Sequence, residues 1–123
     1  MEKTKLLFGF RDVLLIDAWL DHFEAKGFEV DGAMSGEDLL GTAEGFIPEV
    51  LVAEYQLNGE IDSLGVYYEL LGNPDTAHVK LILIADISEA ELKRMNKNIV
   101  LASGILGILA PNKLSFEAVE ELL

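Results

Sequence analysis

The chain has 123 residues, half of them apolar and a quarter charged, which is the composition of one globular domain spanning residues 1–123. Its 22 Asp and Glu residues against 9 Lys and Arg give a formal net charge of -13. Phosphate backbones and anionic membrane surfaces are therefore repelled, and neither nucleic acid nor a membrane is expected as a direct partner. The chain has no cysteine, which excludes disulfides, thiolate metal sites and cysteine nucleophiles.

The first apolar run, within MEKTKLLFGF, predicts a strand over Leu6–Phe10. This run has only about six residues, too few for a signal-peptide core or a membrane span, so we expect a cytoplasmic protein. Apolar residues at helical spacing then predict a helix that begins after Asp12, its N-cap, and ends at Gly27. The segment FEVDGA, residues 28–33, predicts a short second strand.

Ser35 is the expected N-cap of a second helix, because Asp38 follows three residues later as in a capping box. The segment EVLVAE, residues 49–54, is almost continuously apolar, which is typical of a central parallel strand covered on both faces. A turn and a third helix follow in NGEIDSLGVYYELLGN and end before Pro74. Of the two neighbouring tyrosines of this helix, one is expected to cover the sheet and the other to be exposed.

The remaining segments predict a fourth strand in VKLILIAD, a fourth helix in SEAELKRMNKNI, a fifth strand in GILGIL and a last helix in SFEAVEELL. Strict alternation of strands and helices predicts an open parallel sheet with helices on both faces, a three-layer α/β sandwich. The last helix has only about two turns, which leaves open that the chain is one domain of a longer protein. In such sheets the working residues lie at the carboxyl ends of the strands, so we expect the following residues to converge: Phe10, Arg11, Asp12, Glu54, Ala85, Asp86, Ala110 and Pro111.

Several segments, in this order and at this spacing, resemble the receiver domain of two-component response regulators, the CheY-like family. They are GFEVDGAMSGEDLL, PEVLVAE, NPDTAHVKLILIAD and SGILGILAP, and the resemblance covers essentially the whole chain. It implies a flavodoxin-like fold with a five-stranded parallel sheet in the order 2-1-3-4-5. It also implies a function in two-component signal transduction, where a phosphorelay acts on such domains.

The resemblance also implies where phosphotransfer residues should lie, and this chain has other residues there. Receivers hold Mg2+ with an acidic pair after the first strand, and the matching residues here are Phe10 and Arg11, with Asp12 as the only nearby acid. Phe10 offers no oxygen ligand and Arg11 repels a cation. The phosphoacceptor Asp at the end of the third strand is replaced by Glu54, whose side chain is one methylene longer.

The switch positions of the family differ as well. The hydroxyl residue after the fourth strand corresponds to Ala85, and the lysine before a proline after the fifth strand corresponds to Ala110. Lys113 lies on the wrong side of that proline, and Ile108 occupies the aromatic switch position. The pattern resembles a degenerate receiver, or pseudo-receiver, with no catalytic residue, metal ligand or cofactor. The implied function is phosphorylation-independent signalling through a protein partner or an attached output domain.

We put forward the hypothesis that Arg11 and Glu54 form an ion pair across the former phosphorylation site and keep it closed. The alternative is that Glu54 points to solvent. Two other interpretations stay open: an atypical receiver that is still phosphorylated, and a permanently active form in which Glu54 mimics phospho-Asp. A residual metal site of Asp12, Glu54 and Asp86 has the right ligand type, but in a chain with 22 acidic residues solvated loop acids are the favoured explanation.

A second candidate region is an interaction face formed by the fourth helix, the fifth strand and the last helix. Its residues are Lys93, Arg94, Lys97, Ile108, Glu117, Glu120 and Glu121. The basic cluster and the acidic cluster predict either a salt-sensitive homodimer across a two-fold axis or charge balance within one chain.

An enzyme is the alternative of a different class, because the same kind of sheet also binds flavin mononucleotide or small molecules in other proteins. The segment GFRDVLL lacks the Ser, Thr and Gly residues that cradle a phosphate after the first strand. His22 and His78 are far apart in the sequence and have no ligand spacing or Ser partner. The sequence therefore does not favour an enzyme.

Overall fold

The computed structural model describes residues 3–95 and 104–123 and contains one five-stranded sheet in the order β2-β1-β3-β4-β5. Each strand is parallel to its neighbours. The strands are β1 (Lys5–Gly9), β2 (Glu29–Ala33), β3 (Val50–Glu54), β4 (Lys80–Ile84) and β5 (Ile105–Leu109). The predicted fold class and strand order are therefore confirmed.

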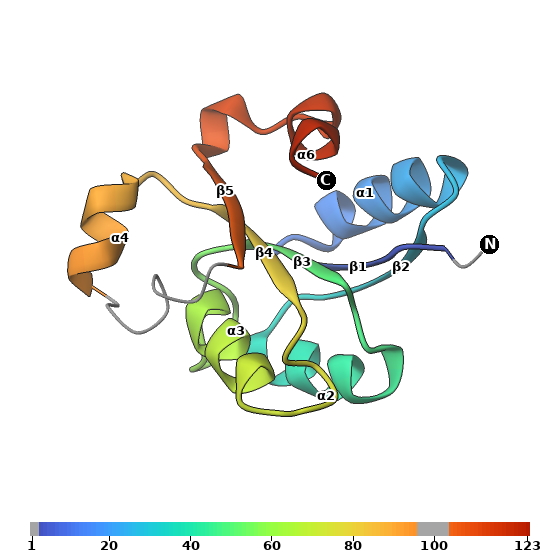
Figure 1. Ribbon diagram of the computed structural model, residues 1–123. Helices are drawn as coiled ribbons and strands as arrows, with labels where there is room; N and C mark the ends of the chain where they lie inside the picture. Colours follow the sequence, from blue (N-terminus) through green and yellow to red (C-terminus); the bar gives the residue numbers. More distant parts are fainter. Residues whose placement is uncertain (1–2, 96–103) are drawn as a thin grey trace.

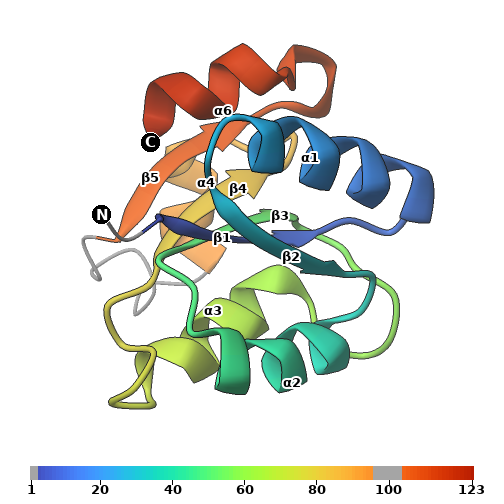
Figure 2. The same ribbon diagram turned by 90° about the vertical axis from the view of Figure 1, so that its right-hand side faces the viewer.

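Helices cover both faces of the sheet, as Figure 1 and Figure 2 show. On one face lie α1 (Val13–Ala25) and α6 (Phe116–Leu122), and on the other lie α2 (Gly36–Phe46) and α3 (Ser63–Leu71). A short helix, α4 (Glu89–Met95), follows β4 at the β5 side of the sheet, and a 3-10 turn, η1 (Pro111–Lys113), follows β5. The predicted fourth helix extends to residue 99, so its last part falls outside the described residues. No helix among the described residues has the length and apolar composition that a membrane crossing requires.

Local side-chain contacts explain where the first helices begin and end. The Asp12 carboxylate accepts a hydrogen bond from the Leu14 amide at 2.9 Å, and the Ser35 hydroxyl accepts one from the Asp38 amide at 3.1 Å. Both N-caps agree with the sequence analysis. Gly27 has φ of 98°, and its amide donates to the Glu24 carbonyl at the end of α1. A glycine with a left-handed backbone conformation is common at the C-terminus of a helix.

The core has two layers because successive residues of a strand point to opposite faces. Phe8 and Phe10 of the first strand segment pack with Trp19 and Phe23 of α1, with ring centroids between 5.4 and 6.3 Å apart. The opposite layer lies against α2 and α3 and is aliphatic apart from Tyr67. Leu92 of α4 is buried in this second layer.

A polar contact joins the two helices on the aromatic side. The Nε2 of His22 on α1 donates to Oε1 of Glu120 on α6 at 2.7 Å. The His22 ring also stacks on Phe116, with 3.9 Å between centroids and 8° between planes. The sequence offered no partner for His22, and the structure provides one 98 residues away.

Tyr67 is fully buried, whereas its neighbour Tyr68 is exposed, as expected for the pair. The Tyr67 hydroxyl has no hydrogen-bond partner among the described residues. We predict that Tyr67→Phe leaves the free energy of unfolding unchanged or raises it by up to about 1 kcal/mol, because a buried hydroxyl with no partner among the described residues loses its hydration on folding. Urea unfolding at neutral pH measures this, and a loss of more than about 1 kcal/mol would contradict it.

The same substitution has a pH-dependent effect. Burial raises the pKa of Tyr67 above the ordinary tyrosine value of 10.0, so the unfolded chain loses this proton at lower pH than the folded chain. The stability contributed by Tyr67 is therefore fully present below pH 10.0 and is lost as the pH rises through the folded-state pKa. Urea unfolding across this alkaline range should show a smaller loss for Tyr67→Phe than for the wild type, with Tyr68→Phe as the matched control.

Candidate functional site

The carboxyl ends of β1, β3, β4 and β5 meet in one open depression, as the sequence analysis predicted for most of their residues. Arg11, after β1, shares this depression with Glu54, at the end of β3. The residues that line it are Arg11, Glu54, Tyr55, Gln56, Ile84, Ala85, Asp86, Ile87 and Pro111. Ala110 lies beside them, directly before Pro111. The candidate site is therefore the crevice in which ligands of doubly wound sheets bind.

Glu54 crosses from β3 to the loop after β1. Its Oε1 accepts a hydrogen bond from the backbone amide of Arg11 at 2.8 Å. The second oxygen lies 3.8 Å from Nη2 of the Arg11 guanidinium. The side chain of Glu54 is 21% exposed and that of Arg11 is 58% exposed, so the carboxylate faces the protein and not open solvent.

The two residues thus lie together as the hypothesis required, but the shorter contact is with the main chain. The amide hydrogen bond has ideal length for a charge-assisted contact, whereas the guanidinium contact is long and largely exposed to water. The extra methylene of Glu relative to Asp extends the carboxylate toward the neighbouring loop. The guanidinium adds a weak second contact.

The loop after β3 is also fastened to its surroundings. The Asn58 side-chain amide donates to the Arg11 carbonyl at 3.3 Å, and the Asn58 backbone amide donates to the Met34 carbonyl at 3.0 Å. Glu37 of α2 accepts from the Ile61 amide at 3.1 Å and packs against Gly59, whose φ is 87°. The backbone of Arg11 is therefore bonded through both its N–H and its C=O to the β3 side of the crevice.

Phe10 does not face the crevice. Its side chain is fully buried in the aromatic layer under α1, because it continues the alternation of β1 on that face. Its predicted convergence with the other strand ends is therefore wrong for the side chain, although its backbone amide bonds the Ala33 carbonyl at 3.3 Å. Position 10 has a packing role, and Arg11 is the first residue that reaches the crevice.

The three acids considered for a metal site are separated by their own contacts. Asp12 caps α1, Glu54 accepts from Arg11, and Asp86 is exposed after β4. Among residues 3–95 and 104–123, no group of three His, Cys, Asp or Glu side chains is arranged to hold a metal ion.

The positions that match the switch residues of receivers carry only apolar side chains. Ala85 is buried at the end of β4, and its amide bonds the Leu109 carbonyl at 2.9 Å. Ile108 is half-buried and packs against the core layer of α2 and α3. Ala110 begins the turn η1, on which Lys113 is exposed. No hydroxyl stands at position 85 and no ammonium at position 110.

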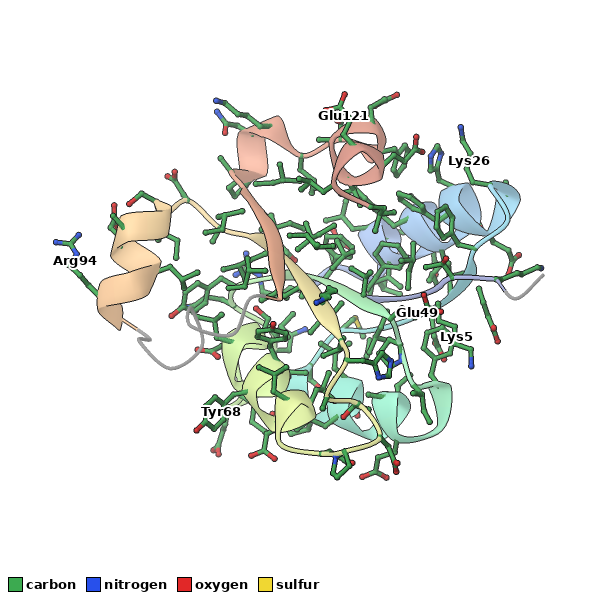
Figure 3. The ribbon with its side chains drawn as sticks, in the orientation of Figure 1. Lys5, Lys26, Glu49, Tyr68, Arg94 and Glu121 are labelled. Carbon is green, nitrogen blue, oxygen red and sulfur yellow. The ribbon has the colours of Figure 1, made fainter. Side chains whose placement is uncertain are left out.

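The predicted interaction face is only partly described. Lys97 and the side chain of Lys93 lie outside the described part of the structure. Arg94 projects from α4 and Glu121 from α6, at well-separated parts of the molecule (Figure 3). Glu117 is exposed on α6 as well.

Glu120 belongs to the acidic cluster, for which the sequence leaves open pairing across a two-fold axis or charge balance within one chain. It accepts the hydrogen bond from His22 within the same chain, because α6 lies alongside α1. That carboxylate belongs to the contact between the two helices and is not a free member of the interaction face.

Two functional features were missed from the sequence. Asn58, whose side chain bonds the Arg11 carbonyl, was treated only as part of a turn. The first turn of α1 exposes Val13, Leu14 and Leu15. A helix in contact with one sheet buries only one face, so it cannot bury three consecutive side chains. Three consecutive apolar residues at a helix start are the signal that would have revealed this.

Neither a protein-family model nor a curated protein sequence matches the chain. Solved structures match its fold over almost its full length. The chemotaxis protein CheY4 of Vibrio cholerae is 13% identical, with a TM-score of 0.78, over 99% of this chain and 100% of that one. A response regulator receiver protein from Pseudomonas putida is 13% identical, with a TM-score of 0.79, over 99% of this chain and 96% of that one.

A CheY-like receiver domain protein from Methanospirillum hungatei is similar in the same way, with 14% identity and a TM-score of 0.78 over 98% of this chain and 91% of that one. At these low identities the comparison establishes a similar backbone arrangement and nothing beyond the fold. The chain has the receiver-domain fold found in two-component response regulators.

The contact between Glu54 and the Arg11 amide predicts unequal effects of substitution. Glu54→Ala should lower the free energy of unfolding by about 0.5–1.5 kcal/mol, because the amide loses its acceptor. Glu54→Gln retains an oxygen acceptor and should cost less, as should Arg11→Ala, which removes only an exposed guanidinium worth about 0–1 kcal/mol. Urea unfolding of the three variants measures the order.

A double-mutant cycle of Arg11→Ala with Glu54→Ala separates the two contacts. We expect a coupling energy below about 0.5 kcal/mol, because the amide contact survives the loss of the Arg11 side chain. A coupling above about 1 kcal/mol would instead assign the interaction to the guanidinium.

Proposed function

We propose that the chain is a pseudo-receiver, a signalling and protein-interaction module of response-regulator type that works without phosphorylation. The observation that supports this most directly is the engagement of Glu54. The carboxylate at the end of β3 is held by the Arg11 amide at 2.8 Å and flanked by the Arg11 guanidinium. A group held in this way is poorly placed as a nucleophile toward a phosphoryl donor, which needs an aligned approach.

The surroundings of Glu54 support the same proposal. Phosphoryl transfer depends on positioned cations that neutralise the charge developing on the phosphoryl oxygens. The cation beside Glu54 is the Arg11 guanidinium, 3.8 Å from its second oxygen, while the side chains of Ala85 and Ala110 supply no polar group. Phosphotransfer therefore lacks the acidic pair, the hydroxyl and the ammonium that it requires.

The loop between β1 and α1 does not favour an enzyme that binds a phosphate group there. This connection consists of Phe10, Arg11 and Asp12. Phe10 is buried, the Arg11 amide already donates to Glu54, and the Asp12 carboxylate caps α1. A phosphate-binding loop needs several free backbone amides. In this loop the Arg11 amide, which points into the crevice, already donates to Glu54.

The test is an amide NMR spectrum of the chain with Mg2+ and beryllofluoride, a stable mimic of an acyl phosphate. We expect no change at Arg11, Glu54, Ala85 or Ala110, because no acidic pair is available to hold the metal. A phosphorylatable receiver domain under the same ion concentrations is the positive control. Mg2+ alone is the second control.

Shifts centred on Glu54 that spread to β5 would overturn the proposal and identify a working, atypical receiver. A constitutively active mimic through Glu54 makes a different prediction. In that case Glu54→Gln would change the amide shifts of Ile108 and its β5 neighbours, whereas a purely local contact confines the changes to the loop after β1.

The proposed module includes a salt-sensitive homodimer through α4, β5 and α6. Opposite charges of Arg94 and Glu121 on separate helices support a two-fold arrangement in which each meets its complement. Sedimentation equilibrium should then show a dimer at low salt that dissociates at high salt. Arg94→Glu should abolish it, and a monomer at low salt and high protein concentration would contradict the prediction.

A further inference from the structure

The loop after β3 contains the dipeptide Asn58–Gly59, and a separate contact fixes each of its two residues. The side-chain amide of Asn58 donates a hydrogen bond to the Arg11 carbonyl at 3.3 Å. Gly59 has φ of 87°, and a Cβ atom at this position would collide with the carboxylate of Glu37. The turn therefore requires glycine, and the bond to Arg11 requires an amide side chain directly before it.

An asparagine directly before a glycine is open to intramolecular attack, because no side chain hinders the approach of the glycine nitrogen. The Gly59 nitrogen loses its proton to hydroxide and attacks Cγ of Asn58. The new N–Cγ bond closes a succinimide ring and the Cγ–Nδ2 bond breaks, while the departing nitrogen takes a proton from water and leaves as ammonia. Water then opens the ring to aspartate or isoaspartate. Water is the only co-reactant, and both Asn58 and Gly59 are exposed to it.

The product has the opposite hydrogen-bonding character at position 58. An ionised carboxylate accepts hydrogen bonds but donates none, so the Arg11 carbonyl loses its partner and faces a negative charge. In the isoaspartate product the main chain also gains a methylene group within residue 58, whose amide donates to the Met34 carbonyl at 3.0 Å. The conversion therefore removes the link to Arg11 and disturbs the link to Met34.

We propose that Asn58 is a deamidation site and that its conversion releases the loop after β1 from the loop after β3. The Arg11 backbone then keeps the bond from its amide to Glu54 at 2.8 Å and loses the bond to its carbonyl. Because the ammonia is lost to solvent, the change proceeds in one direction. It goes beyond the proposed function, since it is a covalent change of the chain that needs no partner.

The contacts of Arg11 also determine how fast the reaction proceeds. The Asn58 side chain has to leave the Arg11 carbonyl before its Cγ can meet the Gly59 nitrogen, so attack occurs from a locally opened loop. The bond from the Arg11 amide to Glu54 opposes this opening at the same residue. Glu54→Ala removes that bond and should raise the conversion rate about two- to tenfold. Glu44→Ala, at an exposed position of α2, is the matched control and should leave the rate unchanged.

The rate is measured by incubating the folded chain at mildly alkaline pH and digesting samples with a protease that cleaves after glutamate. Digestion is carried out at acidic pH, where the reaction is slow. Cleavage after Glu54 and Glu60 releases residues 55–60, in which Asn58 is the only asparagine. In the Glu54→Ala variant, cleavage after Glu49 releases residues 50–60 instead. Fragmentation in the mass spectrometer separates a change at Asn58 from one at Gln56.

Two other asparagines serve as internal controls in the same digest. Asn73 precedes Pro74, whose nitrogen has no proton to lose. Asn112 precedes Lys113, whose side chain hinders the approach of the nitrogen. We expect Asn58 to convert several times faster than either.

The structural consequence is measured with Asn58→Asp, which reproduces the aspartate product. Amide NMR spectra should show shifts at Arg11 and Asp12, because the carbonyl between their amides loses its hydrogen bond. Asn73→Asp is the matched control, since it introduces the same charge at an exposed position. It retains the oxygen that accepts from the Asp75 amide at 3.0 Å and should leave the shifts of Arg11 and Asp12 unchanged.

Any of four results would overturn the inference. These are no conversion of Asn58, conversion of Asn58 later than Asn112, equal rates in the wild type and the Glu54→Ala variant, or unchanged amide shifts at Arg11 and Asp12 in the Asn58→Asp variant. The measurements contain no Mg2+, beryllofluoride or partner, so their outcome is independent of the test of the proposed function.

Discussion

The hydrogen bond from the Arg11 amide to Glu54 is the contact on which the candidate site depends. It joins the loop after β1 to the end of β3 at 2.8 Å, across two strands that are already neighbours in the sheet. Asn58 adds a second link by donating to the Arg11 carbonyl. Because the loop has only three residues before α1 begins, these bonds also determine where the first turn of α1 lies.

In this arrangement the carboxylate of Glu54 is bound by contacts within the protein. A site that binds and releases a metal and a phosphoryl group needs polar groups that change partners. Here the carboxylate is satisfied by the protein itself, and Ala85 and Ile108 offer no second set of polar partners. The rim of the crevice carries the exposed apolar side chains of Val13, Leu15 and Met34.

The sequence was informative where local rules decide the structure and less so where distant side chains meet. The caps at Asp12 and Ser35 follow from short-range hydrogen bonding, and the parallel sheet follows from alternation of elements. The sequence predicts that Arg11 and Glu54 lie close together. It does not predict the hydrogen bond to the Arg11 amide, because that contact depends on side-chain reach at a scale finer than the length of one methylene group. The bond of His22 to Glu120 depends on how α6 lies along α1, which no local pattern encodes.

The start of α1 carries apolar side chains that the helix does not bury. Ile16, Trp19 and Phe23, spaced three and four residues apart, already form the buried stripe of this helix. Leu14 lies outside that stripe, as its exposure shows, and a polar residue there would leave the core unchanged. The apolar first turn is therefore not explained by folding. Val13 and Leu15 of the same turn line the depression that also contains Arg11 and Glu54.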